Sequence, residues 1–153
     1  MAPVADKPAR RVVGIPRGLY YYRHYPMWEA FFRELGADVL LSPPTDRRIL
    51  DRGVETCVGE ACLPVKVYFG HVARIAGDVD FLFVPRYTSI RRREYICPKF
   101  GGLPDMVRAA FSRLPPLIDA EINLRDSEKA VFRAVDAAAA VLGAGRAAAR
   151  RAY

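Results

Sequence analysis

The chain has 153 residues, of which 52% are hydrophobic and 27% charged, and its formal net charge is +7. This length suits one domain with its own core, and the composition excludes a disordered chain. No apolar run approaches the roughly 18 residues of a membrane span and the N-terminal segment lacks the apolar stretch of a secretory signal, so we expect a cytoplasmic protein with three reduced cysteines.

Residues 1–10 are predicted to form a flexible tail, after which short apolar runs closed by Pro or Ser indicate strands. Continuous runs of this kind are typical of strands that are buried on both faces of a parallel sheet. The runs lie at 12–16, 38–42, 81–85 and, more weakly, 116–119.

Apolar residues at helical spacing fill the intervals between these runs. They predict helices at 26–35, 45–50, 64–76, 103–114 and 126–142. We expect residues 11–143 to form a single domain, one lobe of a larger fold, and residues 144–153 to form a basic C-terminal tail.

The alternation of strands and helices predicts a doubly wound α/β fold. We expect a mainly parallel four-stranded sheet in the order 2-1-3-4, with helices on both faces. Right-handed crossovers place the carboxyl ends of all strands at one edge, where ligands of such folds bind.

Two cysteines are predicted to lie at that edge. Cys62 directly precedes a helix, whose dipole favours a thiolate. Cys97 lies in the long connection after the third strand and is followed by Pro, as many iron–sulfur ligands are. Cys57 is interpreted either as a buried small side chain or as a third ligand. The three thiols contain no CxxC pair and are fewer than the four ligands of a complete site.

Basic side chains accompany the cysteines. Arg17 and Arg86 each follow a Pro at the end of a predicted strand, and Lys66 and Lys99 follow Cys62 and Cys97. Guanidinium groups suit carboxylates and phosphates, so these four residues are candidates for binding an anionic cluster or substrate, although either arginine could simply cap the sheet.

The two histidines differ in their predicted roles. His24 follows the first strand and is interpreted either as a substrate contact or as a packed residue, whereas His71 is expected to pack on its helix. No glycine-rich dinucleotide or triphosphate motif is present.

Three segments carry a resemblance to a known family: EACLPVK at 60–66, GHV at 70–72 and YICPKF at 95–100. They resemble the N-terminal lobe of the acyl-CoA dehydratase activase-related family, over about residues 12–119. That family is similar to subunits of 2-hydroxyacyl-CoA dehydratases and to double-cubane-cluster proteins. The resemblance implies two α/β lobes whose cysteines hold a [4Fe–4S] or larger cluster in the cleft between them.

In such relatives two cluster ligands belong to the first lobe, and Cys62 and Cys97 match them by position. A further ligand comes from the second lobe, so we expect a second lobe, a homologous subunit or a second copy to complete the site. The resemblance also implies an acyl-CoA-like substrate.

The first hypothesis is therefore an iron–sulfur component of a dehydratase-like, low-potential redox system rather than a self-sufficient enzyme. A second is a regulatory or assembly partner that keeps the fold without a complete cluster. A third, an anion- or nucleic-acid-binding module, rests on the net charge alone.

Overall fold

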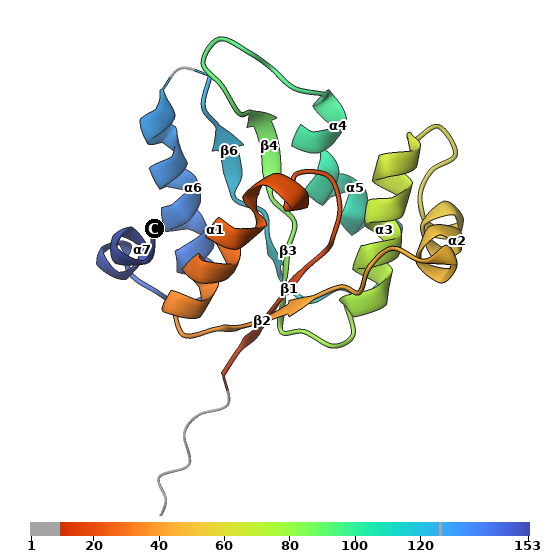
Figure 1. Cartoon of the computed structure of the whole chain (residues 1–153), viewed down its shortest axis with the longest axis horizontal. Helices are drawn as coiled ribbons and strands as arrows, with labels where there is room; N and C mark the ends of the chain where they lie inside the picture. The colour runs from red at the N-terminus through yellow and green to blue at the C-terminus, as the bar shows by residue number, and fades with distance from the viewer. Residues whose placement is uncertain (1–9, 126) are drawn as a thin grey trace, which may run out of the picture.

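A parallel sheet forms the centre of the molecule (Figure 1). The computed structural model describes residues 10–125 and 127–153. The four strands of this sheet have the order β2-β1-β3-β5, which confirms the predicted topology, and β1 is central. Their bounds are Asp38–Leu41 for β2, Val12–Ile15 for β1, Phe81–Phe83 for β3 and Leu117–Ile118 for β5.

Two strands continue beyond this sheet. After short breaks β3 leads into β4 (Arg86–Ser89) and β5 into β6 (Glu121–Asn123), and β4 and β6 pair in parallel as a second sheet. Hydrogen bonds from the Val84 N–H to the Ile118 carbonyl and from the Arg86 N–H to the Ala120 carbonyl join the two ladders. Strands β4 and β6 were not predicted, because their short sequences mix polar and apolar residues and lack a continuous apolar run.

Helices cover both faces of the sheet, as predicted (Figure 1). One face packs against α1, α6 and α7, and the other against α3 and α5, with α2 lying against α3. The helices are α1 (Tyr21–Glu34), α2 (Arg47–Thr56), α3 (Leu63–Ile75), α4 (Pro98–Gly101), α5 (Leu103–Ala110), α6 (Val131–Val141), preceded by the 3-10 turn Glu128–Ala130, and α7 (Arg146–Ala152).

Aromatic rings dominate the core beneath α1. Trp28 and Phe32 lie 4.6 Å and 5.1 Å, centroid to centroid, from the Phe83 ring of β3. The predicted start of this helix at Pro26 was wrong, because α1 begins at Tyr21 and Pro26 lies inside it. Gly36, with a φ of +83°, follows the helix in the left-handed conformation that favours glycine.

Two glycines allow α2 and α3 to touch through their backbones. A Cβ atom on Gly53 would lie 1.9 Å from the carbonyl oxygen of Lys66, and one on Gly70 would lie 1.9 Å from that of Ile49. The Asp46 side chain accepts a hydrogen bond from the Ile49 N–H and caps α2, which is longer than the predicted 45–50.

The C-terminal residues are helical, where the sequence analysis predicted a basic tail. Helix α7 contacts α1 and α6, and Ala149 is fully buried in that contact. Arg150 forms a two-pronged ion pair with Asp136 of α6, at 3.0 Å and 2.8 Å. The alanines of this segment favour a helix, and the ion pair attaches it to α6. In the described parts of the chain, no helix has the length and apolar character needed to cross a membrane.

Candidate functional site

The carboxyl edge of the sheet collects the residues that the sequence analysis selected. It faces the upper half of Figure 1, where α3 and α4 begin, and α1 begins near the middle of the view. From β1 the chain crosses to β2 on one side and later returns to β3 on the other. Ligands of doubly wound folds bind at the point where the strand order reverses in this way, which here lies between β1 and β3.

A small aromatic pocket occupies that point. Its volume is about 30 Å³, and most of its wall consists of apolar and aromatic side chains from α1 and from the segments after β1 and β3. By the usual measure this space holds about two water molecules. The pocket thus suits a short apolar group, and a cofactor ring does not fit without a rearrangement.

His24 contacts Tyr87, one of the residues that line this pocket. Its Nδ1 atom is hydrogen-bonded to the Tyr87 hydroxyl at 2.8 Å, and the Trp28 indole N–H donates to the same oxygen at 3.4 Å. Burial lowers the pKa of His24, with help from Arg23, and burial raises the pKa of Tyr87. Both groups are therefore neutral at pH 7, and His24 packs and orients Tyr87.

The two cysteines predicted to be ligands have equivalent local positions. Cys62 is the N-cap residue of α3 and Cys97 that of α4, in each case with Pro in the first turn of the helix. Both thiols are exposed. Cys57 lies at the end of α2 and is 8% exposed. Burial raises the pKa of the Cys57 thiol, although the charges of Lys66 and Lys99 act in the opposite direction.

Two lysines hold the cysteine segments in place. The Lys66 ammonium donates to the Gly59 carbonyl at 2.9 Å, and the Lys99 ammonium donates to the Glu60 carbonyl at 3.2 Å. The second bond joins the start of α4 to the loop before Cys62. The two exposed thiols therefore lie beside residues that are in direct contact, Lys99 near Cys97 and Glu60 near Cys62.

These residues do not assemble a complete metal site. Among residues 10–125 and 127–153, no group of three or more His, Cys, Asp or Glu side chains could hold a metal ion. The donor set offered at the edge is a pair of exposed thiols, with the third thiol buried nearby. These thiols could provide some of the ligands of a metal site but not a complete set.

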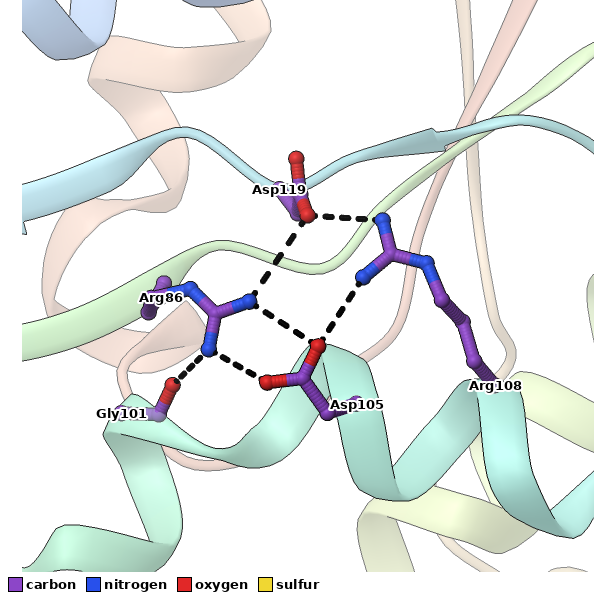
Figure 2. Close-up of polar contacts among 5 residues, drawn as sticks. All are labelled: Arg86, Gly101, Asp105, Arg108 and Asp119. Carbon is purple, nitrogen blue, oxygen red and sulfur yellow. Dashed lines mark hydrogen bonds and ion pairs between the residues drawn. The ribbon is translucent and has the colours of Figure 1, made fainter.

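Arg86 has a different role from the one that the sequence suggested. Figure 2 shows its guanidinium group bound to both oxygens of Asp105, at 2.7 Å and 3.1 Å, and to the Gly101 carbonyl at 2.6 Å. Asp119 lies 3.8 Å away and also pairs with Arg108, which in turn contacts Asp105. The assignment of Arg86 as an anion-binding residue is therefore corrected, because its donors already face two carboxylates.

We predict that Arg86→Met lowers the thermal unfolding temperature by several degrees. The substitution keeps the side-chain stem but leaves Asp105 and Asp119 facing each other without Arg86, at the bend where β3 passes into β4. Arg108→Met is the matched control, because it removes an arginine from the outer side of the same network. Circular dichroism melts would contradict the structural role if the Arg86 variant unfolded at the wild-type temperature.

Arg17 lies at the same edge in a different setting. Its backbone N–H donates to the Ser42 hydroxyl at 2.8 Å, and its guanidinium group lies over the Tyr21 ring at 5.8 Å. The fully buried His71 ring is hydrogen-bonded through Nε2 to the Thr45 hydroxyl at 2.9 Å. The sequence analysis expected His71 to be packed but did not select Ser42 or Thr45. The polar segment SPPT, directly after β2, is the sequence feature that could have indicated these two residues.

Comparison with known proteins identifies the family of this chain. No curated protein and no solved structure gave a significant match. The sequence profile of the family described as "CoA enzyme activase uncharacterised domain (DUF2229)" matches residues 12–153. The match extends past residue 119 and includes α6 and α7. Since it covers nearly all of the domain, the chain belongs to the CoA enzyme activase uncharacterised domain family.

Proposed function

We propose that this domain supplies Cys62 and Cys97 as two thiolate ligands of an iron–sulfur cluster at the carboxyl edge of the sheet. The observation that carries the proposal is the arrangement of the two cysteines. Both are exposed, each occupies the N-cap position of a helix with Pro in its first turn, and their segments are joined by the bond from Lys99 to the Glu60 carbonyl. The cluster would supply low-potential electron transfer when bound.

The surrounding residues suit thiolate ligands. Cys62 lies at the N-terminus of a 13-residue helix, whose dipole stabilises a negative charge. Lys66 and Lys99 place positive charge beside the same loop and hold its carbonyl groups. Cys57 is the less favourable ligand, because its thiol is buried and its pKa is raised.

We propose that the remaining ligands come from outside the residues described here. A [4Fe–4S] cluster takes about four ligands, and this chain has three cysteines. A second lobe, a homologous subunit or a second copy would complete the shell. In the last case a two-fold axis would bring two cysteines from each copy to one cluster.

The test is anaerobic reconstitution with iron and sulfide, followed by metal and sulfide analysis and by visible and electron paramagnetic resonance spectra. We expect Cys62→Ser and Cys97→Ser each to abolish cluster binding. Cys57→Ser, the matched control, should weaken it less. Gel filtration of the reconstituted protein should show whether iron travels with a dimer.

Either of two results would refute this proposal. One is full iron and sulfide in Cys62→Ser or Cys97→Ser. The other is a wild-type protein that stays colourless and iron-free after reconstitution, both alone and with its homologous subunit. The second result would favour a regulatory or assembly role for the domain.

A further inference from the structure

Two buried polar atoms on neighbouring segments have no hydrogen-bond partner. They are the Nε atom of Arg17 and the Nδ1 atom of His71, and they are the only such side-chain atoms in the described parts of the chain. Buried donors and acceptors are normally satisfied, since leaving one unpaired costs about 1–3 kcal/mol. Each of these atoms therefore calls for a partner that the polypeptide does not provide.

The short segment after β2 contacts both residues, the backbone of Arg17 and the ring of His71. Ser42 accepts the hydrogen bond from the Arg17 backbone, and three residues later Thr45 holds the His71 ring. Both contacts are short, at 2.8 Å and 2.9 Å. The positive charge of Arg17 also lowers the pKa of His71, which agrees with their proximity. The loop after β1, the loop after β2 and helix α3 thus converge on one place.

The charge at this place is not balanced. Arg17 is partly buried, its guanidinium group lies over the Tyr21 ring, and it forms no ion pair with any carboxylate whose side chain the structure describes. Asp46 is the acidic residue that acts on His71, but its side chain caps α2 through the Ile49 N–H. Arginine is rarely buried without a counter-charge. An anion would provide it.

The histidine can act as a neutral donor to such an anion. If the Thr45 hydroxyl donates to Nε2, the ring proton is on Nδ1, and the unpartnered atom becomes an N–H donor. Arg17 Nε–H is a second donor. Two such N–H groups match the oxygens of a carboxylate or a phosphate.

We propose that Arg17 and His71 form a binding site for a small oxyanion, a phosphate or carboxylate group, at the carboxyl ends of β1 and β2. The site is separate from the thiol pair of Cys62 and Cys97, and it does not depend on cluster binding. Arg86, which the sequence paired with Arg17, takes no part because it is bound to Asp105.

Titration of the apoprotein with inorganic phosphate tests the site, with acetate titrated in parallel and chloride at matched ionic strength as the reference. NMR signals of the Arg17 Nε–H group and of the His71 ring report on it directly. We expect saturable shifts of both signals. Response to phosphate alone would identify a phosphate site, and response to both anions a general carboxylate and phosphate site.

Variants separate this site from diffuse attraction to a basic protein. Arg17→Met should weaken phosphate binding about tenfold or more, because it removes both the charge and the Nε donor. Arg17→Lys keeps the charge but lacks the Nε donor. Its affinity for phosphate should therefore lie between those of the wild type and Arg17→Met. Arg48→Met is the control, because Arg48 lines a separate groove between α2 and α3. His71 stays unsubstituted in this series, so the buried core is undisturbed.

Three results would overturn the proposal. The first is no saturable response to either anion. The second is equal weakening in Arg17→Met and Arg48→Met, which would indicate general electrostatic attraction. The third is an Arg17 Nε–H signal that exchanges with a bound water molecule and is unaffected by phosphate, since one internal water would then satisfy both atoms.

Discussion

Substituting Ala for Gly70 is expected to be among the most damaging single changes in this domain, costing about 3 kcal/mol or more of unfolding free energy. The added Cβ atom would lie 1.9 Å from the Ile49 carbonyl oxygen of α2. A side chain can rotate away from a clash, but a backbone carbonyl inside a helix cannot move alone. The two helices must therefore separate, and Ile49, which is 3% exposed, loses its packing. The gain in helix propensity of about 1 kcal/mol offsets only part of this cost.

Urea unfolding of Gly70→Ala, Gly53→Ala and the double variant measures the effect. The double variant should lose less than the two single losses added together, because one substitution already opens the contact between α2 and α3. Gly77→Ala is the control, since a Cβ atom there meets nothing within 4 Å. A Gly70→Ala protein as stable as Gly77→Ala would show that the helices do not touch through their backbones.

Acid is expected to destabilise the domain through His71. Burial lowers the pKa of His71 to about 4, and the charge of Arg17 adds to this effect. In the unfolded chain the same group titrates near pH 6.5, so between these values the unfolded state binds the proton and the folded state does not. Stability should therefore fall as the pH drops from about 6.5 towards 4, by about 3 kcal/mol in total.

His71→Gln isolates this contribution, because glutamine can still bond to Thr45 but does not titrate. We expect the variant to be less stable than the wild type at pH 7 and the difference to shrink at lower pH. Unfolding in urea, measured in bis-tris and piperazine buffers with chloride as the counter-ion to avoid added oxyanions, provides the comparison. His24→Gln is measured beside it, because burial also lowers the pKa of His24 and its contribution to the acid effect must be separated from that of His71. Parallel pH profiles for wild type and His71→Gln would contradict the prediction.

The sheet could be predicted from sequence because its strands are buried on both faces. Such strands have continuous apolar runs, as Val12–Ile15 and Phe81–Phe83 do, and these runs are recognisable without knowledge of their partners. The connections between them then determine the strand order and the functional edge. The position of Cys62 at a helix start followed from the neighbouring Pro64, whereas the short helix α4 that begins after Cys97 was not predicted.

The features that were missed depend on residues far apart in sequence. Strand β4 exists through its pairing with β6, more than 30 residues away. The role of Arg86 is determined by Asp105 and Asp119, and neither carboxylate is near it in the chain. A local motif, Pro followed by Arg, made both Arg17 and Arg86 candidates for anion binding or for capping the sheet edge. Only the tertiary partners distinguish the two.

The packing of α7 against α1 has a consequence for how the chain folds. During synthesis α1 leaves the ribosome before α7, which begins more than 100 residues later. Until then part of the apolar surface of α1 and of the first strands has no permanent cover. Contacts between such distant segments are slow to form, and exposed apolar surface invites aggregation during synthesis. Helix α7 thus covers part of α1 only after the intervening elements of the domain have been made.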